Sequence, residues 1–193
     1  MRTVIQKISL VVVLAVGGMA SAQIQKQGSE VFPGKFQVGV SPLGVSVDWR
    51  GAGAFYKFTA DFAGRLAEAN KLGIYLGGGV NYGVAPGPVN SPLAHDVQLW
   101  MFVMLTMEKL VPIPLVPMIQ AGLGTDVLLS GSNYAGATLA IRLGGGLHYF
   151  LTKNVGLGFE THFTVGPYIL NTNPTQYTWY GQWDFLLGGR FAF

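Results

Sequence analysis

Residues 178–193 read TWYGQWDFLLGGRFAF, and this stretch decides the fold. Its odd-numbered positions are mostly large and apolar, whereas its even-numbered positions are mostly polar or small, with Leu186 as the exception. The apolar set is Trp179, Trp183, Phe185, Leu187, Phe191 and Phe193. Alternation with a period of two is typical of a β-strand with one apolar and one polar face. A helix would place Asp184 and Arg190 among the aromatic side chains, so the pattern favours a strand.

The same alternation recurs along most of the chain. It predicts strands within residues 36–50, 55–65, 72–84, 96–108, 119–127, 139–149 and 155–165, in addition to 178–193. Residues 96–108, taken alone, could also form a buried helix, and the neighbouring segments favour the strand. At Pro42 the alternation slips by one residue, which indicates either a β-bulge or two short segments of which only the second enters the sheet.

The distribution of charge over the two faces predicts a membrane barrel. One face of the strands is bulky and apolar, and the other carries essentially all the charges of the strands. An eight-stranded barrel has too narrow an interior for the bulky set, so this set should face lipid. We therefore expect an all-β fold, an eight-stranded antiparallel up-and-down transmembrane β-barrel that is apolar outside and polar inside.

The connections follow from an even number of strands, which places both termini on the periplasmic side. Periplasmic turns are expected near Glu68, Pro112 and Thr152. Outer loops are expected near Gly51, Val89 and Ser132, with the last loop over residues 167–177.

The first residues are typical of a secretory signal peptide. Residues 8–20 are largely apolar, follow Arg2 and Lys7, and lead into the small residues Ala20-Ser21-Ala22. The expected organisation is a cleaved signal peptide over 1–22, a periplasmic segment over 23–34 and an outer-membrane barrel over 35–193. Two of the twelve basic residues and none of the nine acidic ones lie in the signal, so the mature chain carries a net charge of only +1. Neither a nucleic-acid partner nor, without cysteine, a disulfide framework is expected.

The alternating aromatic terminus closed by Phe193 resembles the last strand of bacterial outer-membrane β-barrels. Residues 35–193 as a whole resemble the small eight-stranded barrels of the OmpA and OmpX type. This resemblance implies a monomer in the outer membrane of a Gram-negative cell, in contact with membrane lipid and lipopolysaccharide. It also implies recognition by the barrel-assembly machinery through Trp183, Phe185, Leu187, Phe191 and Phe193. The expected outer loops are shorter than those of OmpX-like proteins, and no peptidoglycan-binding domain of the kind that OmpA-like proteins often carry is expected.

Four polar residues on neighbouring strands are candidates for an interior cluster. Arg142, Glu160, His162 and Asp184 all point to the lumen in the phase given above. Two close carboxylates repel each other, and a cation between them relieves the repulsion. We expect Arg142 to bridge Glu160 and Asp184, with His162 hydrogen-bonded beside it.

Three functions remain open from the sequence. The first is a structural or surface-contact barrel with a filled interior, whose outer contacts could include Tyr134, Tyr168 and Ile169. The second is a small porin-like pore for ions or solutes. The third, lipid-modifying acyl transfer, would need Glu160, His162 and Thr164 to act as acid, base and nucleophile. The Gly runs lack the context of a phosphate loop, and no cofactor, no metal and no enzymatic activity are expected.

Overall fold

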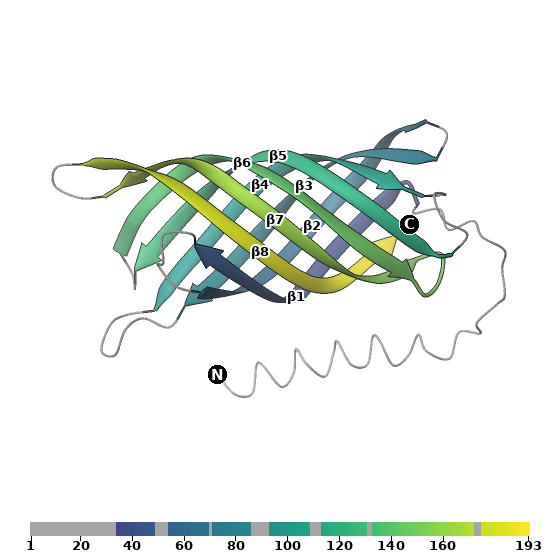
Figure 1. Ribbon diagram of the computed structural model, residues 1–193, viewed down its shortest axis with the longest axis horizontal. Helices are drawn as coiled ribbons and strands as arrows, with labels where there is room; N and C mark the ends of the chain where they lie inside the picture. Colours follow the sequence, from purple (N-terminus) through teal and green to yellow (C-terminus); the bar gives the residue numbers. More distant parts are fainter. Residues whose placement is uncertain are drawn as a thin grey trace.

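The chain forms one closed antiparallel barrel in the computed structural model (Figure 1). The structure describes residues 34–48, 54–69, 71–85, 93–108, 113–130, 133–171 and 175–193. The eight strands are β1 (Phe36–Asp48), β2 (Ala54–Ala69), β3 (Leu72–Ala85), β4 (Ala94–Met107), β5 (Leu115–Ser130), β6 (Asn133–Phe150), β7 (Val155–Leu170) and β8 (Gln176–Ala192). Each strand pairs with its neighbours in sequence, and β1 closes the ring against β8. The prediction of an eight-stranded up-and-down barrel is confirmed.

Closure satisfies the backbone at both ends of the ring. Gln37 lies opposite Ala192 in the β1–β8 pairing, and Phe36 N donates to Phe193 O at 3.2 Å. Because hydrocarbon offers no hydrogen-bond partner, a sheet that spans a membrane must close in this way. Among the described residues, none belongs to a helix with the length and apolarity that a membrane crossing requires.

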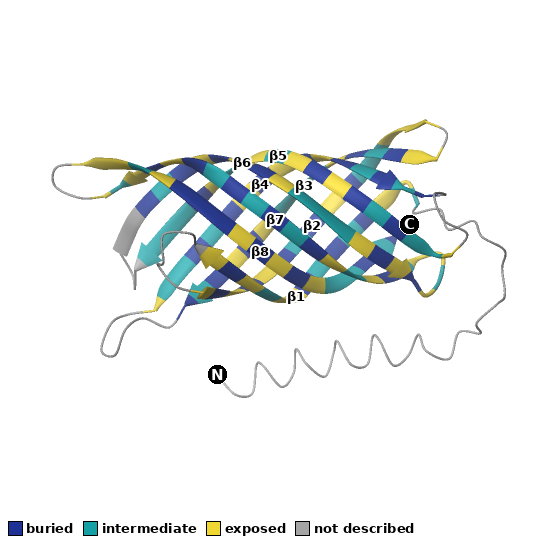
Figure 2. Cartoon of the chain, viewed as in Figure 1, coloured by how far each residue is buried: buried dark blue, intermediate teal, exposed yellow. Residues whose placement is uncertain are grey.

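The side chains alternate between the two surfaces along every strand, as the dark and yellow segments in Figure 2 show. In β4, Trp100, Phe102 and Met104 are buried, whereas Met101 and Val103 are exposed. The outward-facing side chains are predominantly Leu, Val, Ile, Phe, Tyr and Trp. The predicted arrangement, apolar outside and polar inside, is therefore confirmed by the burial of both sets.

The slip at Pro42 is a bulge within one continuous strand. The register of β1 against β2 shifts between Ser41 and Gly44, and its register against β8 shifts between Val40 and Leu43. Phe36 to Val40 therefore belong to the sheet, and the interpretation as two separate segments was wrong.

The prediction of a last loop over residues 167–177 was too long. The β7–β8 ladder continues through Pro167 opposite Trp179 and Tyr168 opposite Thr178 to Leu170 opposite Gln176. Pro lacks a backbone donor but can remain in a strand where no ladder bond is needed from it. Tyr168 consequently points into the barrel and is 2% exposed, so it is not the outer contact residue that we expected. Ile169, another predicted outer contact, is exposed. The Tyr134 side chain, the signal peptide and most of the 23–34 segment lie outside the described residues.

Candidate functional site

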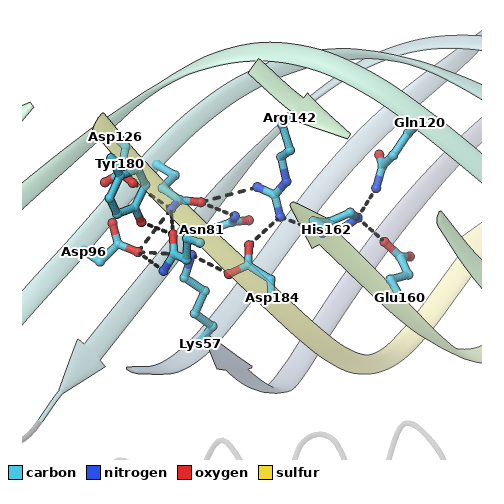
Figure 3. A network of polar contacts seen from close by, with 12 residues as sticks. Lys57, Asn81, Asp96, Gln120, Asp126, Arg142, Glu160, His162, Tyr180 and Asp184 are labelled. Atoms are coloured by element: carbon cyan, nitrogen blue, oxygen red, sulfur yellow. Dashed lines mark hydrogen bonds and ion pairs between the residues drawn. The ribbon is translucent and has the colours of Figure 1, made fainter. Parts of the chain in front are cut away.

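The candidate site is the network of polar side chains inside the barrel (Figure 3). Three of the four residues that the sequence predicted are brought together by the register of β6, β7 and β8. Gly144 lies opposite His162, His162 lies opposite Asp184, and Arg142 lies opposite Thr164. Gly144 leaves room for the imidazole, since a Cβ at this position would lie only 2.0 Å from His162 Cδ2. The inward phase of three neighbouring strands thus assembles the cluster at one depth.

Arg142 occupies the centre of this cluster. Its Nη2 donates to Asp184 Oδ2 at 3.1 Å and to His162 Nδ1 at 2.6 Å, and Nη1 donates to Gln98 Oε1 at 3.4 Å. Its guanidinium carbon lies 3.9 Å from the centre of the Trp100 ring, a cation–π contact. The guanidinium is therefore fixed in both its plane and its direction by four side chains.

Glu160 has different partners from those that we predicted. Its Oε1 pairs with Arg190 Nη2 at 2.8 Å and with His148 Nε2 at 3.2 Å, and its Oε2 lies 3.3 Å from His162 Nε2. Arg190 also pairs with Asp61 through Nη1 at 3.1 Å. The cation that bridges Glu160 to a second carboxylate is therefore Arg190, and the prediction that Arg142 bridges Glu160 was wrong. Glu160 lies one inward position deeper in β7 than His162, and the imidazole stands between it and Arg142.

His162 lies between Arg142 and the Glu160 carboxylate, which pairs with Arg190. Its Nδ1 accepts from Arg142, and its Nε2 faces Glu160 and the amide of Gln120. A neutral imidazole protonated on Nε2 satisfies both the arginine donor and the carboxylate acceptor. Both ring nitrogens are thus occupied by partners other than Thr164.

A second part of the network lies toward the end of the barrel where β2 and β4 begin. Lys57 Nζ lies 3.1 Å from Asp96 Oδ2 and 3.0 Å from Asp184 Oδ1, so Asp184 is shared between Lys57 and Arg142. Gln98 Nε2 donates to Asp96 Oδ2 at 3.2 Å and to Asp126 Oδ2 at 3.0 Å. This amide therefore holds two neighbouring carboxylates with one donor group.

Apolar side chains fill part of the lumen next to the network. Ala63, Tyr75, Trp100, Phe102, Met104 and Met118 form one buried cluster. Trp100 and Phe102 lie 4.7 Å apart between ring centres, and Trp100 also contacts His162 at 5.5 Å. A cavity beside Arg142, lined by Gln98, Trp100, Asp126 and Thr164 among others, has a volume of about 10 Å³. That is room for about one water molecule.

A separate ion pair lies at the end of the barrel where β1 begins. Arg65 contacts Glu108, and its Nε and Nη2 donate to the Tyr75 hydroxyl at 3.0 and 2.7 Å. The Tyr75 hydroxyl in turn lies 3.1 Å from Glu108 Oε1 and 3.2 Å from the Gly34 carbonyl oxygen. This cluster links β2, β3 and the residue after β4 to Gly34, which lies two residues before β1.

The site is a network of buried ion pairs and hydrogen bonds in which several polar atoms, among them Arg142 Nε and Thr164 Oγ1, have no hydrogen-bond partner among the described residues. Among the described residues, no three His, Cys, Asp or Glu side chains gather as a metal site requires. Sequence reasoning did not include Arg190, Lys57, Gln98 and Trp100 in the cluster. Each of them was already in the inward phase of its strand, so the missing information was their depth and not their side.

The C-terminal aromatic set lies on the outer surface of β8. Trp183, Phe185, Leu187 and Phe193 are exposed, and Phe191 is half-buried. Phe185 stacks on Phe159 of β7 with ring centres 6.4 Å apart, and Trp183 lies 4.8 Å from Phe163. These side chains thus form an aromatic surface that is continuous from β7 to β8.

Comparison with solved structures shows the same fold in bacterial outer-membrane proteins. Neisserial surface protein A aligns with a TM-score of 0.59 at 14% identity, over 82% of this chain and 96% of that one. The N-terminal β-barrel domain of OprF from Pseudomonas aeruginosa aligns with a TM-score of 0.52 at 15% identity, over 86% of this chain and 100% of that one.

The outer membrane protein OprG from the same organism gives a TM-score of 0.50 at 12% identity, over 86% of this chain and 98% of that one. The chain has the fold of the small outer-membrane β-barrels. No protein-family model and no curated protein sequence matches it. At these identities the likeness concerns the fold, and the role of the barrel has to be argued from its own residues.

Proposed function

We propose that the chain is an integral outer-membrane barrel whose filled polar interior supports a structural or surface-contact role. The observation that carries this proposal is the contact of the Arg142 guanidinium with Trp100, Asp184, His162 and Gln98 across the lumen. These partners come from β4, β7 and β8, so the contacts of one β6 side chain reach across the barrel. An eight-stranded barrel is just wide enough for side chains to fill.

The bulky side chains of β4 add to this obstruction. Trp100, Phe102 and Met104 succeed one another on its inward face and are all buried. Moving a solvated ion past them would require separating the Arg142–Asp184 pair or displacing an aromatic ring. Separating the ion pair is costly, because leaving a buried charge without its partner costs several kcal/mol of free energy.

The alternative function is a small pore for ions or solutes. It is favoured by the lining of charged side chains, which reaches from Asp96 and Asp126 near the outer end to Arg65 and Glu108 at the periplasmic end. Conduction would require these pairs to exchange partners during permeation, whereas a structural barrel would keep them fixed.

Lipid-modifying catalysis has less support. Glu160, His162 and Thr164 lie on the lumen side and are buried, away from the surface that an acyl chain would contact. Both nitrogens of His162 are engaged by Arg142, Glu160 and Gln120, so this base does not address the Thr164 hydroxyl. Our proposal therefore contains no enzymatic step. The lipid, lipopolysaccharide and assembly-machinery contacts, the export by a cleaved signal peptide and the monomeric state remain part of the proposal.

Planar-bilayer recording of the purified protein tests the filled interior. We expect no steady current from the parent protein. The variant Arg142→Ala/Phe102→Ala/Met104→Ala, which removes the guanidinium that spans the lumen together with two bulky side chains, should give discrete openings. Folding of both proteins is checked by their shift in unboiled gels. A steady ohmic current from the folded parent would overturn the proposal in favour of the pore.

A further inference from the structure

The two rims of the barrel carry different charges. One lysine lies in each connection at the end where β1 begins, namely Lys35 before β1, Lys71 between β2 and β3, Lys109 between β4 and β5, and Lys153 between β6 and β7. At the opposite end, Arg50 is the only Lys or Arg in the sequence between the strands. Lys35, Lys71 and Lys153 are exposed, and Lys109 lies outside the described residues.

The backbone at Lys35 and Lys71, and at the residue after Lys153, is hydrogen-bonded to a neighbouring segment. Lys35 O accepts from Arg65 N at 2.7 Å, and Lys71 O accepts from Glu108 N at 2.9 Å. Next to Lys153, Asn154 O accepts from Ala192 N at 2.8 Å. The three side chains therefore start from backbone positions in different connections at the end of the barrel where β1 begins.

Each lysine also stands at the border of the apolar surface. Lys35 adjoins Phe36, Lys71 adjoins Leu72, and Lys153 follows Leu151 by two positions; these apolar neighbours are 51%, 36% and 57% exposed. A lysine in this position lays its methylene stem along apolar surface and extends its ammonium to the polar boundary. In a lipid bilayer, that boundary is the headgroup layer.

The acidic groups at this rim are used by other partners. Glu68 pairs with Arg65 at 2.8 Å, and Glu108 is buried against the same guanidinium. Within the described part of the chain, no ion pair involves Lys35, Lys71 or Lys153. The three ammonium groups therefore have no carboxylate partner among the described residues and stand at headgroup depth.

We propose that this lysine rim binds the phosphate headgroups of anionic phospholipids in the leaflet that it faces. The inference rests on the proposed insertion of the barrel into a membrane. The ligand chemistry follows from charge complementarity and from depth, since a compact ammonium attracts phosphate as a point charge. A lysine close to an anionic lipid surface contributes about fivefold in affinity, and salt weakens this effect.

The test measures lipid preference with phosphatidylglycerol and phosphatidylcholine as the probes. The full mature chain is placed in phosphatidylcholine nanodiscs, and the association of a dilute spin-labelled lipid of either type is compared at low and at high salt. We expect the parent protein to prefer phosphatidylglycerol by about fivefold or more at low salt. Lys35→Gln/Lys71→Gln/Lys153→Gln should abolish most of this preference, whereas the same three positions changed to Arg should keep it.

Equal association of the two lipids with the inserted parent protein, or an unchanged preference in the Gln variant, would overturn the inference. Lysine-dependent sedimentation with peptidoglycan, without a lipid preference, would assign the rim to a different partner and would also overturn it. Failure of the parent protein to insert at all refutes the proposed membrane function instead, so the two failures are distinguishable.

Discussion

Arg190→Gln is the substitution that should most disturb the interior. The Arg190 guanidinium donates to Asp61 Oδ1 at 3.1 Å and Oδ2 at 3.4 Å, and to Glu160 Oε1 at 2.8 Å. It is a single cation that holds two buried carboxylates from β2 and β7. Glutamine keeps part of the side-chain volume and removes the charge, so the two carboxylates would be left close together with only histidines beside Glu160.

The expected magnitude follows from comparison with Arg142. Removing one partner of a buried ion pair costs about 3–5 kcal/mol of unfolding free energy, because the other charge stays buried without compensation. Arg190→Gln leaves two carboxylates in that condition and belongs at the upper end of this range. After Arg142→Gln, Asp184 still has Lys57 at 3.0 Å, so we expect a loss of about 1–3 kcal/mol, the cost of a lost charged hydrogen bond.

The assay is equilibrium unfolding in urea of the protein folded into lipid vesicles, followed by Trp fluorescence. Arg190→Gln should lower the midpoint more than Arg142→Gln does. Adding Asp61→Asn and Glu160→Gln to Arg190→Gln should recover part of the loss, because replacing all partners of a pair costs less than replacing one. Lys35→Gln on the exposed rim serves as the control and should change the free energy by no more than about 0.5 kcal/mol.

Two results would refute this reasoning. One is an equal midpoint for Arg190→Gln and Arg142→Gln, which would mean that Lys57 does not compensate Asp184. The other is a further decrease on neutralising Asp61 and Glu160, which would mean that their charges do not repel in the absence of Arg190.

Two further predictions concern neighbouring glycines and the C-terminal strand. Gly144→Ala should lower the free energy of unfolding by about 1–3 kcal/mol, because its Cβ would meet His162 Cδ2 at 2.0 Å. Gly145→Ala is the control and should cost less, because its Cβ lies on the other face, 3.2 Å from Met118 O. Equal urea midpoints for the two variants would contradict the packing around His162. Phe191→Ser/Phe193→Ser should block assembly of the barrel in cells without blocking secretion, as measured by the heat-shifted band in membrane fractions, and normal levels of that band would refute an assembly signal in these residues.

The fold was predictable because alternation is a local property of the chain. In β8, Trp183, Phe185 and Leu187 face outward and Asp184 faces inward, and the sequence alone reveals this separation. The bulge in β1 was visible for the same reason, since an extra residue moves every later side chain to the opposite face. The last loop was predicted to begin at Pro167, although Tyr168 continues the inward phase of the strand.

Pairing inside the lumen was less predictable because alternation gives the face of a residue and not its depth. The strands are inclined and staggered, so the register of the whole ring determines which residues lie at the same depth in the lumen. Glu160 was expected beside Arg142 and Asp184, yet the register places His162 opposite Asp184 and sends Glu160 one step deeper to Arg190. Only the relative shift of β7 and β8 could have distinguished these two arrangements.

The interior and the rims therefore differ in what they can offer to other molecules. The Arg142 and Arg190 guanidinium groups have carboxylate partners from this chain, and the lumen beside Arg142 has room for about one water molecule. A ligand that entered there would have to break these ion pairs, and the small space leaves no room for new contacts that would compensate for the lost interaction energy. At the rim where β1 begins, Lys35, Lys71 and Lys153 are exposed, and binding a phosphate there breaks no described ion pair. Contacts with other molecules should accordingly be sought at the rims and on the outer surface before the lumen.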